Sequence, residues 1–321
     1  MTVTSSRPAT SNSWMMSVPP QAWFGVSAVF HYLGPSFAVL LFPAIGVFGV
    51  AWLRIASAAL VFAAWRNPWR SFHTADRHTR WLLIAFGLCL AGMNSCFYLA
   101  LARLPMSLVA AMEFVGTIAV ALYGLRSRRN FAALALAVFG VFLLIEVKWS
   151  SDPIGLAWSF LNGALFVFYI LFGHRIAAGD GVARLGTAMA IAFIAILPIG
   201  FTEAVKAFGS AGLLLAGCGV GLCSSVIPYI CDQLAMSRLP RASFALMLAL
   251  LPATATVIGI VVLAQMPSLR DLLGILLVMG GVALHKPASP HTPSPETEAS
   301  VAQGAQPISG REKILKPDTA Q

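Results

Sequence analysis

The stretch ARLPMSLVAAMEFVGTIAVALYG, residues 102–124, decides how the chain is organised. A second stretch, SRLPRASFALMLALLPATATVIG at residues 237–259, matches it at a constant offset of 135 residues (237 − 102 = 135). Both stretches place Arg-Leu-Pro after a small residue and end in Gly after an apolar run. Self-similarity at a fixed offset indicates an internal repeat. Arg-Leu-Pro is also a common start for a helix at a membrane interface, and that simpler interpretation stays open here.

The composition around these stretches is that of a membrane protein. The 321 residues are 58% hydrophobic and 10% charged, whereas about 25% are charged in a typical soluble domain. Too few ionisable groups remain to cover a surface in contact with water, which argues against a soluble enzyme. The net charge of +9 does not indicate nucleic acid as a partner, because the basic residues stand in short clusters between long apolar runs. The predicted surroundings are a lipid bilayer.

Ten apolar runs approach the ~20 residues that cross the hydrocarbon core of a bilayer. None of them shows the alternation of barrel strands, so each is predicted to be an α-helix and the fold class to be an all-α integral membrane protein. The runs cover residues 22–42, 45–65, 82–102, 107–125, 131–146, 154–174, 183–202, 210–235, 242–265 and 269–285.

The repeat divides these runs into two units, because the same signal precedes the fourth and the ninth run. The units are residues 22–146 and 154–285, each with five spans. Since five is odd, the second unit enters the membrane inverted relative to the first, and secondary transporters bind substrate at the interface of such a pair. The sequence therefore predicts ten transmembrane helices arranged as two inverted five-helix repeats.

The basic residues predict the orientation. With both termini in the cytoplasm, sixteen Lys and Arg residues fall in inside segments and four in outside segments, as the positive-inside rule requires. Residues 1–21 are then a retained cytoplasmic segment and not a signal peptide. Residues 286–321, rich in Pro, Ser, Thr and Glu, are expected to form a disordered cytoplasmic tail. The five cysteines show no metal-binding spacing, so we expect neither a metal nor a cofactor.

Three further stretches carry a resemblance to a known family. They are LRIASAALVFAAWRNPWR (residues 53–70), GMNSCFYLALARLPMSLVAAMEFVGTIAVAL (92–122) and IPYICDQLAMSRLP (227–240). These stretches resemble the threonine/homoserine exporters of bacterial inner membranes, in the EamA-domain branch of the drug/metabolite transporter superfamily. The resemblance implies a ten-helix fold and proton-driven export of a small amino acid or a related metabolite. The chain departs from the family pattern at Val39, at Leu251-Pro252 and at Ala264-Gln265, where the family commonly carries a Lys, an acidic residue before Pro, and Gly-Glu.

Three charged residues, Arg54, Glu113 and Asp232, lie within the predicted spans. A charge inside a membrane is costly and usually faces a cavity or a partner. Glu113 is the leading candidate for a proton-binding carboxylate that shares a pocket with the substrate; the alternative is a structural ion pair with Arg54, and the two roles coexist if the pair opens during transport. Asp232 follows Pro228 and Tyr229, a predicted helix irregularity that frees backbone carbonyls for a polar pocket. Its alternative is solvation from the cytoplasm.

Four more polar residues, Asn94, Tyr98, His31 and Tyr229, complete the candidate substrate- and proton-binding set. Asn94 and Tyr98 lie one turn apart on the third span and share a face, from which they hydrogen-bond either a substrate or a neighbouring helix. His31 is either a proton relay or a packing histidine.

The motifs that are absent narrow the class of function. The sequence holds no phosphate-binding Gly-x-x-x-x-Gly-Lys loop and no HExxH or DxxxD grouping, so neither an ATP-driven pump nor an enzyme is expected. The leading prediction is a secondary active transporter that exports a threonine- or homoserine-like amino acid across the inner membrane by proton antiport with alternating access. The alternative is a broad-specificity drug/metabolite exporter, and a membrane-embedded enzyme or a channel is less favoured. The sequence leaves open whether two copies pair as a homodimer.

Overall fold

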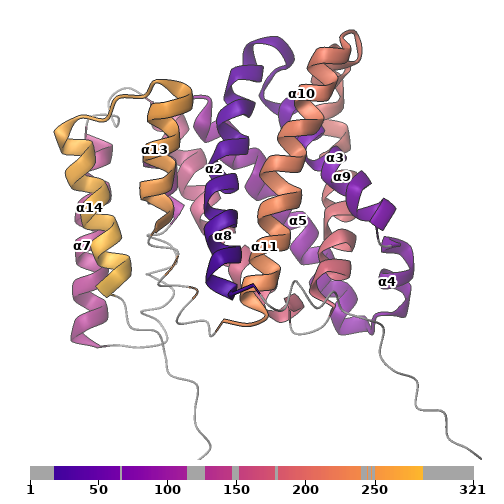
Figure 1. The fold of residues 1–321 in the computed structure, drawn as a ribbon, viewed down its shortest axis with the longest axis horizontal. Helices are drawn as coiled ribbons and strands as arrows, with labels where there is room; N and C mark the ends of the chain where they lie inside the picture. The colour runs from indigo at the N-terminus through magenta and orange to yellow at the C-terminus, as the bar shows by residue number, and fades with distance from the viewer. Residues whose placement is uncertain are drawn as a thin grey trace, which may run out of the picture. The chain divides into compact units, whose positions relative to one another are not determined.

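The computed structural model describes residues 18–65, 67–113, 127–146, 152–177, 180–239, 244, 247 and 250–284. Within these residues all regular secondary structure is helical (Figure 1). The predicted tail and most of the predicted N-terminal segment lie outside the described residues, as do the second half of the fourth predicted span and part of the first half of the ninth.

The helices follow the predicted runs, and several extend beyond them. They are α2 (Pro20–Ile45), α3 (Val47–Trp65), α4 (Pro68–Thr74), α5 (Arg77–Leu101), α7 (Arg128–Glu146), α8 (Pro153–Ala177), α9 (Gly181–Phe208), α10 (Ala211–Gly221), the π-helical turn η1 (Leu222–Val226), α11 (Ile227–Met236), α13 (Leu251–Leu263) and α14 (Leu269–Leu284).

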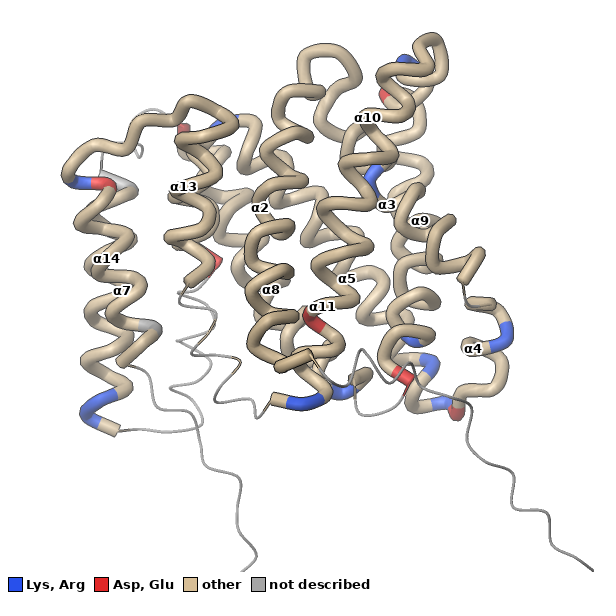
Figure 2. The backbone as a smooth tube through the Cα atoms, viewed as in Figure 1, with Lys and Arg blue, Asp and Glu red and all other residues tan. Residues whose placement is uncertain are grey.

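Six segments are long and apolar enough to cross a membrane. They are α2, α3, α5, α8, α9 and the continuous segment Ala211–Met236 formed by α10, η1 and α11. Helix α13 is a shorter apolar helix, and α7 and α14 have 19 and 16 residues. The prediction of an all-α, multi-pass membrane protein is confirmed at this level. Charged residues lie mostly towards the ends of these helices, as a bilayer requires (Figure 2).

The helices run side by side and pack in pairs from distant parts of the sequence. Helix α7 packs on α14, α3 on α9, α5 on α8, and α2 on α11 (Figure 1). Glycines allow the closest approaches: a Cβ on Gly140 of α7 would lie 2.6 Å from the carbonyl oxygen of Gly274 on α14. Small residues at helix contacts are typical of membrane bundles, where packing and hydrogen bonds replace the hydrophobic driving force.

The two Arg-Leu-Pro sequences form the same turn at the end of a helix. After α5, the Leu104 amide donates to the Ala100 carbonyl at 2.8 Å, and after α11 the Leu239 amide donates to the Ala235 carbonyl at 2.8 Å. Both pairs differ by 135 residues (239 − 104 and 235 − 100). The offset that the sequence reveals therefore holds in the local backbone as well.

One element was not predicted from the apolar pattern. Helix α4 lies in the connection between α3 and α5, where Asn67 caps it by accepting a hydrogen bond from the Arg70 amide at 3.2 Å. Pro68 at the first helical position suits such a start.

Candidate functional site

Arg54 of α3 is the centre of a buried polar cluster. Its side chain is 3% exposed. Nε donates to the Ser225 hydroxyl at 2.8 Å, and Nη2 donates to the Ser224 carbonyl at 2.8 Å and to the Tyr229 hydroxyl at 3.5 Å. The guanidinium also lies 5.1 Å from the centre of the Tyr98 ring, within the range of a cation–π interaction.

A proline explains why the Ser224 carbonyl is available to Arg54. In a regular α-helix that carbonyl would accept a hydrogen bond from the amide four residues later, which is position 228. Pro228 has no amide hydrogen, and the preceding turn η1 is π-helical. The prediction that Pro228 marks an irregularity with a freed carbonyl is therefore confirmed.

Three polar atoms in this cluster have no hydrogen-bond partner among the described residues. They are Nη1 of Arg54 and the hydroxyls of Tyr98 and Ser224. Each of these groups is a hydrogen-bond donor. A buried cation with donors to spare is suited to an anionic ligand.

Glu113 is the last described residue of the helical stretch 106–113, and its side chain is 2% exposed. Its carboxylate accepts hydrogen bonds from the Tyr32 hydroxyl at 3.2 Å and from Nδ2 of Asn162 at 2.7 Å. Arg54 is not among its hydrogen-bond partners, and Arg54 itself is held by the second half of the chain. The predicted ion pair between Glu113 and Arg54 is therefore wrong for this conformation, because each group finds closer neutral partners.

Asp232 of α11 is also buried, at 5% exposed. It accepts hydrogen bonds from the Ser27 hydroxyl at 2.5 Å and from the Tyr169 hydroxyl at 2.8 Å. The interpretation of Asp232 as a residue solvated from the cytoplasm is therefore wrong in this structure.

The remaining candidates lie beside these groups. Asn94 donates to the carbonyl of Leu90 in its own helix at 2.7 Å and accepts from the Tyr229 hydroxyl at 3.2 Å, so it links α5 to α11. His31 is buried, and its ring contacts the rings of Tyr32 and Phe166 at centroid distances of 5.3 and 6.2 Å.

The neutral residues that hold the two acids were not among the predicted site residues; they are Ser27, Tyr32, Asn162 and Tyr169. Serine and asparagine inside apolar helices carry no signal of their own, because they also hydrogen-bond to carbonyls of their own helix, as Ser36 and Ser95 do. The internal repeat could have identified two of these residues. Ser27 and Asn162 are separated by the repeat offset (162 − 27 = 135), and each donates a hydrogen bond to one of the acids.

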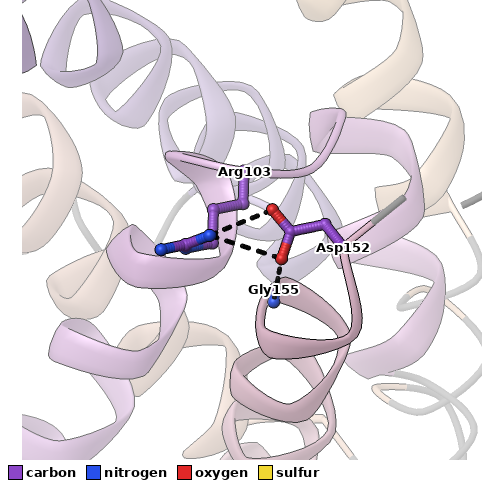
Figure 3. Close-up of polar contacts among 3 residues, drawn as sticks. All are labelled: Arg103, Asp152 and Gly155. Atoms are coloured by element: carbon purple, nitrogen blue, oxygen red, sulfur yellow. Dashed lines mark hydrogen bonds and ion pairs between the residues drawn. The ribbon is translucent and has the colours of Figure 1, made fainter. Parts of the chain in front are cut away.

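A second polar contact joins the ends of two helices. Nη1 of Arg103 lies 3.2 Å from Oδ2 of Asp152, whose Oδ1 accepts from the Gly155 amide at 2.8 Å at the start of α8 (Figure 3). The Gly155 amide and then the Arg103 guanidinium hold the pKa of Asp152 below its usual value. In the second Arg-Leu-Pro sequence, Nη1 of Arg238 donates to the Val18 carbonyl at 3.1 Å, next to the start of α2.

Within the described residues, no group of three or more His, Cys, Asp and Glu side chains is placed to hold a metal ion.

Comparisons with known proteins identify the family. Residues 153–285 match the EamA-like transporter family. The threonine/homoserine exporter RhtA of Salmonella typhimurium is 35% identical over 235 residues, which are 72% of this chain and 79% of that protein. The Escherichia coli K12 protein of the same name is 34% identical over the same shares.

A crystal structure of a protein 16% identical to this chain shows the same fold. It aligns with a TM-score of 0.53 over 82% of this chain and 96% of that one. The curated relatives are exporters and not enzymes, which confirms that the sequence encodes a transporter. The chain belongs to the EamA-like transporter family.

Proposed function

We propose that the protein is a secondary active transporter that exports a threonine- or homoserine-like amino acid across the bacterial inner membrane in exchange for protons. The exporters of that name, at 34–35% identity, support the substrate class and the membrane. The buried polar cluster supports a site for a small charged molecule.

The observation that carries the proposal is the state of Arg54. Its guanidinium is held on one side by Ser224, Ser225 and Tyr229, while Nη1 has no partner among the described residues. A charge in a membrane protein requires compensation. The carboxylate of an amino acid supplies it, with the unpartnered Tyr98 hydroxyl as a second donor.

Glu113 is the proposed proton-binding group. Its two partners, Tyr32 and Asn162, are neutral donors, so neither supplies a positive charge that would hold it ionised permanently. A carboxylate in this setting can exchange a proton without breaking a salt bridge. Proton uptake from outside and release inside would then drive substrate outward.

Alternating access is proposed to follow from two inverted five-helix repeats, residues 22–146 and 154–285, with ten spans. Asn94 and Tyr229 are separated by the repeat offset (229 − 94 = 135) and hydrogen-bond to each other, as residues near a two-fold axis would. The packing of α5 on α8 has its counterpart in the packing of α11 on α2. These pairs support a pseudo-symmetric carrier with its site at the repeat interface.

The proposed orientation puts both termini in the cytoplasm. The sixteen-to-four distribution of Lys and Arg over the chain is the argument behind it.

The test is threonine counterflow in proteoliposomes that contain the purified protein. Arg54→Lys keeps the positive charge and removes the forked donor set, so we expect counterflow to fall at least about tenfold. Arg80→Lys is the matched control, because Arg80 also donates to backbone carbonyls, those of Ala75 and His73, at a helix end. Glu113→Gln is expected to retain most of the counterflow and to lose threonine-driven proton movement.

Two outcomes would overturn the proposal. If counterflow is unchanged in Arg54→Lys, Arg54 does not bind the carboxylate of the substrate. Competition by large apolar cations but not by threonine or homoserine would favour the broad-specificity drug/metabolite exporter instead.

A further inference from the structure

The two buried acids are held by the same pair of helices. Glu113 accepts one hydrogen bond from Tyr32 of α2 and one from Asn162 of α8. Asp232 accepts one from Ser27 of α2 and one from Tyr169 of α8. Each acid thus has one neutral donor on each helix, and a movement of α2 against α8 changes the surroundings of both acids together.

The spacing along the helices places the acids at two depths. Ser27 precedes Tyr32 by five residues on α2, and Asn162 precedes Tyr169 by seven on α8. At about 1.5 Å per residue these steps are about 8 and 10 Å. Ser27 and Tyr169 contact Asp232, whereas Tyr32 and Asn162 contact Glu113. The order of these contacts is opposite along the two helices, so α2 and α8 are antiparallel. Asp232 lies nearer the proposed cytoplasmic start of α2.

His31 lies between the two levels. It follows Ser27 by one turn on α2 and directly precedes Tyr32. It lines a narrow cavity together with Ser27, Tyr169 and Asp232, and the volume of about 10 Å³ suits about one water molecule. The ring is 8% exposed and packs against the rings of Tyr32 and Phe166, and the positive charge of Arg54 acts on it. Among the described residues its nitrogens form no hydrogen bond, so they can bind a proton or the water in the cavity.

We propose that Asp232 is a second proton-binding carboxylate and that His31 passes protons to it from Glu113 on their way to the cytoplasm. The proposal rests on the proposed proton antiport. Protonated Glu113 gives its proton to one ring nitrogen of His31 and becomes a carboxylate. As the ring takes up this proton, it gives the proton on its other nitrogen to Asp232, directly or through the water, so the ring stays neutral beside the Arg54 charge. Asp232 then releases the proton inside.

Two measurements on the same proteoliposomes test this path. Threonine counterflow at equal pH needs no net proton movement, whereas a threonine gradient drives protons through the whole path, and an internal pH dye reports them. For Asp232→Asn and His31→Gln we expect the ratio of proton flux to counterflow to fall at least about tenfold. Asp232→Glu keeps a proton-binding group and should restore most of the ratio. The matched control is Ser36→Ala, a buried serine of α2 that donates to the Leu33 carbonyl of its own helix.

The outcomes separate this proposal from the proposed function. A wild-type ratio in Asp232→Asn or in His31→Gln would overturn the relay and leave proton antiport in place. Proton flux that is absent in the wild type, with counterflow intact, would overturn antiport and the relay with it. If Asp232→Asn does not reach the membrane, His31→Gln decides, because it leaves both acids and their four donors in place.

Discussion

At the scale of single residues, Pro228 helps to position Arg54 because proline has no amide hydrogen. Without an amide hydrogen at position 228, the Ser224 carbonyl accepts from Arg54 Nη2 at 2.8 Å. An alanine there would offer an amide to that carbonyl and compete with the guanidinium. A hydrogen bond to a charged group contributes about 1.5–3 kcal/mol. We therefore predict that Pro228→Ala raises the threonine concentration for half-maximal counterflow about tenfold.

The control is Pro198→Ala, which also removes a proline from inside a helix but at an exposed position of α9. It should leave the concentration dependence unchanged. If Pro228→Ala behaves like the control at equal protein level, the freed carbonyl does not set the position of Arg54.

The single residues also show where prediction from sequence succeeds and fails. Arg54, Glu113 and Asp232 were predictable because a charge in an apolar run is rare. Their partners were not predictable, because the sequence suggested only an opposite charge, an ion pair between Arg54 and Glu113, as an alternative role. Burial favours short hydrogen bonds from any polar group in reach, and the partners that the structure reveals lie up to 205 residues away in the sequence.

At the scale of helices, the same cluster depends on how closely α10 approaches α3. A Cβ on Gly221 would lie 2.6 Å from the Arg54 carbonyl oxygen and would also collide with the Ser57 hydroxyl. Overpacking of this kind costs about 1–3 kcal/mol and shifts the backbone. We predict that Gly221→Ala lowers the melting temperature of the detergent-solubilised protein and reduces threonine counterflow.

Gly219 is the matched control on the same helix, because a Cβ there has nothing within 4 Å. The sequence alone does not separate the two glycines, because both lie in one apolar run and only the rotation of the helix distinguishes them. A loss in Gly219→Ala as large as in Gly221→Ala would show that helix propensity, and not the contact with α3, controls stability.

The helices themselves were largely predictable, since apolar runs near membrane length indicate spans. Local departures were harder to foresee. The apolar pattern of helix α4 is too short to predict a helix. The sequence indicates η1 only through Pro228, which lies six positions after the turn begins. Such features depend on backbone hydrogen bonds that hydropathy does not report.

At the scale of the whole bundle, each Arg-Leu-Pro arginine contacts the region where the first helix of the other half begins. Arg103 reaches Asp152 before α8, and Arg238 reaches Val18 before α2. The sequence motif therefore has a physical role beyond starting a helix at the membrane interface, because it ties the two halves together. The sequence revealed the motif and its offset, but its partners lie 49 and 220 residues away and had no shared pattern to identify them.

The contact between Arg103 and Asp152 gives a prediction on pH. The Gly155 amide and Arg103 lower the pKa of Asp152 in the folded protein. A carboxyl group with a lowered pKa stabilises the fold above its unfolded pKa of about 3.9 and loses that contribution as the pH falls through the folded value. Asp152→Asn keeps an acceptor for the Gly155 amide and removes the charge. The melting temperature of Asp152→Asn should therefore lie below that of the wild type at pH 7, and the difference should shrink below about pH 4.

A neutral cap provides the comparison. Ser210 accepts from the Leu213 amide at the start of α10, so the loss in Ser210→Ala should be the same at both pH values, because a hydroxyl does not titrate in this range. If the two variants show the same pH dependence, the change reflects the whole protein and not the Asp152 charge. If Asp152→Asn equals the wild type at pH 7, the ion pair does not stabilise the fold, and Arg103 joins the halves only through packing of its side-chain stem against Gly155.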